Sequence, residues 1–419
     1  MSHVPLLLLQ LVVILATARA CGWLLRHVGQ PAVIGEMAAG VVLGPIVFGA
    51  LFPDFHAGLF AKDSLPALSS LSTLGLVLFM CIVGAELRAP DGVRAQMKAA
   101  GAVGALGVLL PMALGIGISP WLYPELAPSG VGFWPFALFM AAAMSITAFP
   151  VMARILKDRG MTQTRLGRLA LSSAALADVM AWIMLAFVVA LVGAGEGDAG
   201  FVRITFGLVA LVAIVFGVLK PLFAWLMRRH APDGRPSPML LALILIGALA
   251  CAALTEWLGL HAVFGAFLFG ACLPRDDRLL QHLVERVETV AIVLLMPIFF
   301  ALAGLNTTAD AFSAAGLGAL ALIVAAAVFG KIAGGAAGAR IAGYGWRESL
   351  ATGSLMNARG LMELIVMKVG LDAGLIGPEL FTMLLVMALL TTVMTGPLLI
   401  LFAGRHVDVA ASSKSPSAI

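Results

Sequence analysis

The chain has 419 residues, of which 61% are hydrophobic and only 11% are charged. A soluble core does not need that much apolar surface, so the composition predicts an all-α polytopic membrane protein. The formal net charge of +4 comes from basic residues that fall in short loops rather than in one patch. This distribution excludes a nucleic-acid-binding surface, and we expect the lipid bilayer as the surrounding partner.

Apolar runs long enough to cross a bilayer as helices follow one another along almost the whole chain. We predict about 13 transmembrane helices, at residues 4–25, 31–52, 66–87, 97–122, 133–156, 166–194, 201–227, 238–257, 259–274, 287–305, 311–341, 347–370 and 378–403. They form one transmembrane unit over residues 1–404. A short polar cytoplasmic tail is predicted at 405–419.

The loops between these spans alternate between rich and poor in basic residues. Most of the 26 Lys and Arg residues fall in loops or span ends on one side, for example Arg154, Arg159 and Arg168. The positive-inside rule assigns this side to the cytoplasm. We therefore expect a multi-pass protein of the cell (inner or plasma) membrane, with its N-terminus outside and its C-terminus inside.

Two regions of the chain repeat a glycine pattern. Gly35-x4-Gly40 in the second span recurs as Gly265-x4-Gly270 in the ninth span. The offset of seven helices is odd, so the two repeats have opposite topology. Inverted repeats are typical of secondary transporters, whose binding site lies near the midplane where the repeats meet.

The same offset pairs the fifth span with the twelfth, and both contain helix-breaking residues. The fifth carries Ser145, Thr147 and Pro150, and the twelfth carries the run Asn357-Ala358-Arg359-Gly360. We predict interrupted helices that cross here, which would leave free backbone ends for ion coordination and charge compensation. Ordinary Pro and Gly kinks are the alternative.

Two charged residues lie deep in the predicted spans. Asp178 follows Arg168 by ten residues, which places it ~15 Å from the inner face, near the midplane. Lys331 precedes Arg340 by nine residues and reaches about 13–14 Å on another helix. Opposite charges that are each costly alone are expected to pair. An intramembrane carboxylate is typical of an ion or proton site; an Asp satisfied only by a neighbouring helix is the alternative.

Other charged residues in the spans have more local interpretations. Arg359 and Glu363 stand at i and i+4, which predicts an ion pair on one helix face. We count both, with Lys331, as charge-compensating candidates. Three further residues are candidate supporting groups, although the last can simply be solvated at the end of its span: Glu36, Asn357 and Glu256.

Motifs for enzymatic chemistry are missing from the sequence. It contains no phosphate-binding loop, no HExxH, no nucleophile elbow and no paired Cys motif. We therefore expect neither an enzyme nor a cofactor.

Seven stretches resemble the second branch of the monovalent cation:proton antiporter superfamily, and most of all the plant-type cation/H⁺ exchangers. They are GQPAVIGEMAAGVVLGP (29–45), LGLVLFMCIVGAEL (74–87), ITAFPVMARILKDRG (146–160), TRLGRLALSSAALADVMAW (164–182), TEWLGLHAVFGAFLFGACLP (255–274), MPIFFALAGL (296–305) and LMNARGLMELIV (355–366). The resemblance covers nearly the whole chain. It implies the Na⁺/H⁺ antiporter fold with crossed broken helices, an elevator motion and a homodimer.

The resemblance also implies roles for single residues. Asp178 matches the essential cation- and proton-binding aspartate, Thr147 the crossing-helix position near the ion, and Lys331 a basic residue of a neighbouring helix. The chain departs from the family at Ala177, where Asp, Asn or Gln is usual. Because a second acid is missing there, we predict exchange of one cation for one proton without net charge.

These observations favour secondary antiport of Na⁺ or K⁺ against H⁺. The predicted ion site consists of Asp178, which takes the monovalent cation, with Thr147 and Ser145. One alternative is an exporter of another, organic cation, permitted by the small Ala177. A channel or a membrane sensor is the second, although a channel needs a polar lining or a filter ring that the isolated midplane charges do not supply.

Overall fold

The computed structural model describes residues 3–86, 94–162, 164–193, 198–230, 237–274, 281–282 and 284–403. Within these ranges the regular structure is entirely helical, which confirms the predicted all-α fold. Nine of the described helices are long and apolar enough to cross a membrane. The total of 13 spans stays a prediction, and the predicted tail at 405–419 lies outside the described residues.

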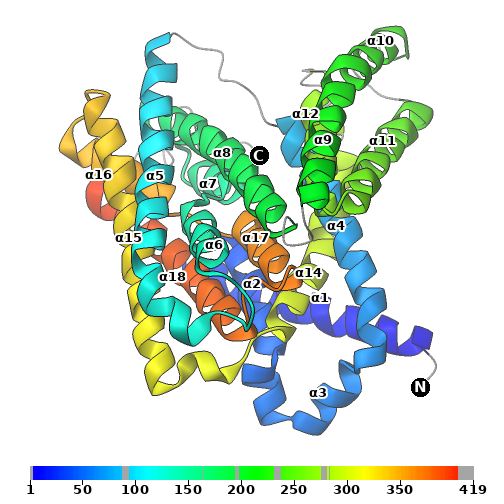
Figure 1. Ribbon diagram of the computed structural model, residues 1–419, viewed down its shortest axis with the longest axis vertical. Coiled ribbons are helices and arrows are strands. Elements are labelled where there is room, and N and C mark those ends of the chain that lie inside the picture. The colour runs from blue at the N-terminus through cyan, green and yellow to red at the C-terminus, as the bar shows by residue number, and fades with distance from the viewer. Residues whose placement is uncertain are drawn as a thin grey trace, which may run out of the picture. The chain divides into compact units, whose positions relative to one another are not determined.

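The chain divides into two compact units (Figure 1). The first unit comprises residues 1–18, 42–88 and 186–305, and the second comprises residues 19–41, 89–185 and 306–419. Three helices run across the division: α1 (His3–His27), α2 (Ala32–Leu43) and α8 (Arg165–Gly193).

The first unit packs its helices around apolar side chains. Its helices are α3 (Pro53–Leu59), α4 (Leu65–Glu86), α9 (Asp198–Ile214), α10 (Lys220–His230), α11 (Pro238–Trp257), α12 (Ala262–Cys272) and α14 (Met296–Leu305), with short turns at Pro45–Gly49, Lys62–Ser64, Val215–Leu219, Val284–Glu288 and Ala291–Leu295. The α4 and α12 helices touch at two glycines. A Cβ on Gly84 would collide with the carbonyl oxygen of Phe267, and one on Gly270 with that of Cys81. Small residues therefore set the close approach of these helices, as expected in lipid.

The second unit contains the two interrupted helices. Its helices are α5 (Arg94–Leu126), α6 (Phe133–Ser145), α7 (Phe149–Asp158), α15 (Ala314–Ile341), α16 (Trp346–Met356), α17 (Leu361–Asp372) and α18 (Pro378–Ala403), with a 3₁₀ turn at Ala309–Phe312. In Figure 1 the long helices α5 and α15 run side by side. Their contact is again made by glycines, since a Cβ on Gly334 would meet the carbonyl oxygen of Leu106.

The interruptions fall where the sequence predicted them. The α6 helix ends at Ser145 and α7 starts at Phe149 with Pro150 in its first turn; α16 ends at Met356 and α17 starts at Leu361. Proline has no N–H, so Pro150 cannot donate to the carbonyl of Ile146, and α6 cannot continue unbroken into α7. The two breaks meet, because the N–H of Ala148 donates to the carbonyl of Ala358 at 3.0 Å.

Candidate functional site

The end of α6 is closed by two buried cations. The last carbonyls of a helix have no partner within it and carry the negative end of its dipole. Arg359 donates from Nη1 to the carbonyl of Ala143 at 3.1 Å and from Nη2 to that of Met144 at 2.7 Å. Lys331 donates to the carbonyl of Ser145. Both cations are fully buried and compensate the helix end.

Lys331 is fully coordinated in this position. Besides the Ser145 carbonyl, its Nζ donates to the carbonyl of Gly107 at 3.0 Å and to Oγ1 of Thr147 at 2.6 Å. An ammonium group has three N–H donors. All three are used, by α5 and by the first break, so Lys331 holds these two segments together.

Asp178 lies on α8, and its side chain faces the N-terminal end of α7. Its carboxylate is only 3% exposed, and it accepts from the backbone N–H of Phe149, the first residue of α7. The start of a helix is the positive end of its dipole and favours a carboxylate. Oδ1 of Asp178 has no hydrogen-bond partner among the described residues. The carboxylate is therefore oriented by α7 and retains a free acceptor.

A small cavity adjoins this carboxylate. It has a volume of about 10 Å³ and is lined by Ile146, Asp178, Ala181, Met362 and Val366. A space of this size holds about one water-sized particle. Residues of both broken helices and of α8 thus enclose a space for one small ion or water beside the carboxylate.

The expected direct pairing of Asp178 with Lys331 is not formed in the described structure. The two charges influence each other electrostatically, but no ion pair joins them. The physical reason is that the three ammonium donors of Lys331 are already bound elsewhere. Sequence position gives the depth of both residues and leaves their direction around the helix axis undetermined.

The expected ion pair between Arg359 and Glu363 is present, but not on one helix face, because Arg359 lies in the break before α17 begins at Leu361. The distance from Nη1 to Oε1 is 2.7 Å, and both side chains are completely buried. Thr392 on α18 anchors the backbone of Arg359, because its hydroxyl accepts from the Arg359 N–H at 2.9 Å and donates to the Arg359 carbonyl at 2.8 Å. Arg359 is therefore held at its backbone and at its guanidinium group.

The remaining candidates have other partners. Ser145 donates its hydroxyl to the Ala142 carbonyl at 2.9 Å and meets Lys331 through its carbonyl. Asn357 donates to the carbonyl of Thr391 at 3.1 Å and leaves its Oδ1 unpartnered among the described residues. The structure brings Ser145, Thr147 and Lys331 together at the first break.

The two other glutamates belong to local structure. Glu36 lies 3.5 Å from Arg19 in an ion pair. Glu256, in the first unit, accepts from the N–H of Ala262 at 2.8 Å and so caps the start of α12. Sequence reasoning missed the Gly107 carbonyl and the Thr392 hydroxyl, since backbone acceptors leave no mark in residue type and Thr392 lies in an ordinary apolar run.

Comparisons with known proteins agree on one family. The pattern of the transmembrane sodium/hydrogen exchanger family matches residues 12–402. The chain is 39% identical over 397 residues to the Na⁺/H⁺ antiporter NhaS4 of Synechocystis, covering 94% of this chain and 96% of that protein. It is 38% identical over 398 residues to cation/H⁺ antiporter 17 of Arabidopsis thaliana, where the match covers 94% of this chain but only 48% of the relative.

A solved structure supports the fold. The sodium proton antiporter MjNhaP1 from Methanocaldococcus jannaschii aligns with a TM-score of 0.64 over 96% of this chain and 100% of that chain. The sequence identity is 14%, so this likeness bears on the fold alone.

Proposed function

Because the chain belongs to the sodium/hydrogen exchanger family, we propose that it exchanges Na⁺ or K⁺ for H⁺ across the membrane in which it is embedded. Asp178 is the proposed site of both ions. The observation that carries this proposal is a buried carboxylate whose Oδ1 has no hydrogen-bond partner among the described residues, beside a cavity for one small particle.

In this proposal Asp178 binds either a cation or a proton, and never both at once. A cation needs the ionised carboxylate, and a proton neutralises it, so one ligand excludes the other. An empty ionised carboxylate is costly to move through a low-dielectric region, and this cost restricts transport to the neutralised site. Oxygens of Thr147 and Ser145 are the proposed further ligands of the cation.

The size of the cavity favours an inorganic cation. A volume of about 10 Å³ accepts one water-sized particle, whereas an organic cation would require Met362 and Val366 to move away. Na⁺ and K⁺ both remain candidates.

Replacing Asp178 tests the proposal. In proteoliposomes with an enclosed pH dye, Asp178→Asn is expected to abolish cation-driven proton flux, because an amide keeps the volume but cannot alternate between charged and neutral forms. Asp178→Glu is expected to retain part of it. Ser72→Ala, at a buried polar residue of the first unit, serves as the control and is expected to transport normally. Exchange at normal rates by Asp178→Asn would show that the ion binds elsewhere.

Competition at one carboxylate has a pH signature. The apparent KM for the cation is expected to rise steeply as pH falls, because protons occupy the site. The same vesicles, assayed from about pH 5.5 to 8.5, measure this dependence. A KM that stays flat over that range contradicts a shared site.

We further propose a stoichiometry of one cation for one proton. The residue before Asp178 is the buried Ala177, so no second carboxylate stands at that position. Lys331 would supply a second proton only if cation binding broke a pair with Asp178. In this structure Lys331 is instead held by three oxygens, none of which belongs to Asp178.

A voltage test separates these cases. Each net charge moved is worth about 2.3 kcal/mol per 100 mV, so electrogenic exchange responds to an imposed potassium–valinomycin potential. Na⁺-driven proton flux is expected to be indifferent to voltage, both in the wild type and in Lys331→Arg. A voltage dependence that disappears in Lys331→Arg would make the lysine the second proton carrier.

The family resemblance extends the proposal to the mode of transport. We propose elevator-type alternating access in a homodimer of the cell membrane, with the N-terminus outside and the C-terminus cytoplasmic. All the described buried charges lie in the second unit, which supports the elevator part of the proposal because the second unit would then carry the ion.

A further inference from the structure

One described cavity of the second unit lies away from Asp178 and is basic. It has a volume of about 540 Å³. The wall is formed by the end of α1, the turn into α2, the α7 helix and α18, through Arg26, Gly29, Gln30, Pro31, Ala32, Arg154, Ile155, Arg159, Thr392 and Gly396. Three of these residues are arginines, and none is acidic.

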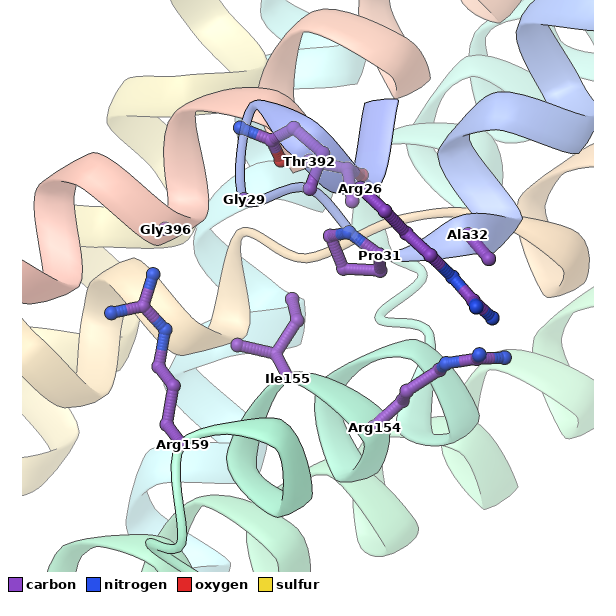
Figure 2. A pocket seen from close by; sticks show the side chains of 10 residues that line it. Arg26, Gly29, Pro31, Ala32, Arg154, Ile155, Arg159, Thr392 and Gly396 are labelled. Atoms are coloured by element: carbon purple, nitrogen blue, oxygen red, sulfur yellow. The ribbon is translucent and has the colours of Figure 1, made fainter. Parts of the chain in front are cut away.

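The three arginines surround the cavity (Figure 2). Arg26 and Arg154 extend toward the same side of it, and Arg159 stands at the other side beside Gly396. A Cβ on Gly396 would lie 3.2 Å from Nη2 of Arg159, so this guanidinium packs directly against the α18 backbone. Three cations around one cavity repel one another, which makes the empty arrangement unfavourable.

Within the described residues, the acidic side chain that acts on two of these arginines is already paired with another residue. Arg26 and Arg154 both feel the field of Glu36, but Glu36 makes its ion pair with Arg19. None of the three guanidinium groups forms an ion pair within the described part of the chain. The same wall includes Ala32, where the twelve-residue helix α2 begins, and a helix start adds further positive potential.

From the cavity and its three arginines we propose that this is a binding site for the phosphate groups of a phosphorylated organic ligand. Guanidinium groups bind phosphate oxygens through paired charge-assisted hydrogen bonds, and arginine is the preferred residue for such recognition. A cavity of about 540 Å³ is within the usual range for small organic ligands and larger than one phosphate group needs.

The cavity adjoins the segments that hold Asp178 and Arg359. Arg154 lies on α7, whose first N–H binds Asp178, and Thr392 holds the backbone of Arg359. A ligand in the cavity would join α7, α18 and the turn between α1 and α2. Binding therefore stabilises the second unit and is detectable as resistance to heat.

Two sources can present the phosphate groups, a soluble nucleotide or the headgroup of a phospholipid. The full-length protein is placed in phosphatidylcholine nanodiscs, and its melting temperature is measured with inorganic phosphate, with ATP, and with phosphatidylinositol phosphate added to the lipid. Chloride at matched ionic strength is the reference. A rise with ATP or phosphate identifies a soluble ligand, and a rise only with the anionic lipid identifies a headgroup; either supports the site.

Variants decide whether the arginines hold the ligand. Arg154→Gln combined with Arg159→Gln is expected to weaken the apparent affinity at least about tenfold, since two charge-assisted contacts are lost. Lys157→Gln is the matched control, because Lys157 lies exposed on the same helix and does not line the cavity. It is expected to bind as the wild type does.

A lysine variant keeps the experiment informative if the glutamine variant does not fold. If the glutamine variant melts early without ligand, Arg154→Lys with Arg159→Lys keeps the charges and loses the paired geometry, and is expected to bind with intermediate affinity. The proposal is overturned if no phosphate compound raises the melting temperature of the wild type. It is equally overturned if the glutamine or lysine variants respond as strongly as Lys157→Gln.

Discussion

The two compact units bury different kinds of side chain. All buried charged residues of the described structure lie in the second unit: Glu36, Asp178, Lys331, Arg359 and Glu363. Among the side chains whose burial is described, those that the first unit buries and that are polar are all uncharged: Gln10, Ser64, Ser72 and Thr255. Burying an ion costs several kcal/mol unless partners compensate it. The second unit meets this cost with the free ends of broken helices, and the first avoids it.

This difference predicts that the second unit is sensitive to charge and the first to volume. Substitutions that remove a buried charge are expected to be most harmful where another buried charge loses its partner. Substitutions that add a methyl group are expected to be harmful where two helix backbones touch. Matched changes in the two units test both statements.

The largest effect on stability is expected from Arg359→Met. It removes the partner of the buried Glu363 and uncovers the carbonyls of Ala143 and Met144. Breaking a buried pair from one side costs about 3–5 kcal/mol. Denaturation of the purified protein in detergent measures this loss, and Arg228→Met, at an exposed arginine of the first unit, is expected to be neutral.

A double variant sharpens the interpretation. Arg359→Met together with Glu363→Met removes both charges, and it is expected to recover part of the lost stability. Recovery stays incomplete because the two carbonyls of α6 remain uncovered. If the double variant is no more stable than Arg359→Met, the unpaired carboxylate is not the main cost.

A smaller loss is expected from Lys331→Met. Three acceptors lose their donor, namely the carbonyls of Gly107 and Ser145 and the hydroxyl of Thr147, but no ion-paired carboxylate is left behind. We expect the free energy of unfolding to fall by about 2–3 kcal/mol. Lys220→Met, at an exposed lysine of α10, is the control. A loss larger than that of Arg359→Met would mean that Lys331 does pair with Asp178.

The smallest effect is expected in the first unit, from Gly84→Ala. The added Cβ would collide with the carbonyl oxygen of Phe267 on α12, and overpacking of this kind costs about 1–3 kcal/mol. Gly58→Ala provides the comparison, because a Cβ there meets nothing within 4 Å. Equal stability of the two variants would show that α4 and α12 can move apart without cost.

Much of the fold follows from local sequence. The length of the apolar runs is dictated by the thickness of the bilayer, and most described helices fall within the predicted spans. The short helix α3 is an exception, because it lies between the second and third predicted spans. The breaks around Thr147 and Asn357 were also predicted, because Pro150 lacks a backbone N–H and Gly360 has a low helix propensity. The spacing of four residues predicted the pair of Arg359 with Glu363, although the structure places Arg359 in the break before α17 rather than on the helix.

Contacts between distant segments had to come from the tertiary structure. The spacing from Arg340 predicts the depth of Lys331, but the rotation and approach of α15 and α5 decided that it binds the Gly107 carbonyl rather than Asp178. Every residue has a backbone carbonyl, so residue type does not predict which carbonyl accepts a hydrogen bond from Lys331. In the same way Arg26, Arg154 and Arg159 read along the chain as ordinary basic residues at span ends, and only packing brought them around one cavity. The spacing of residues along the chain determines which near neighbours can meet, whereas the partner of a buried charge depends on every helix that encloses it.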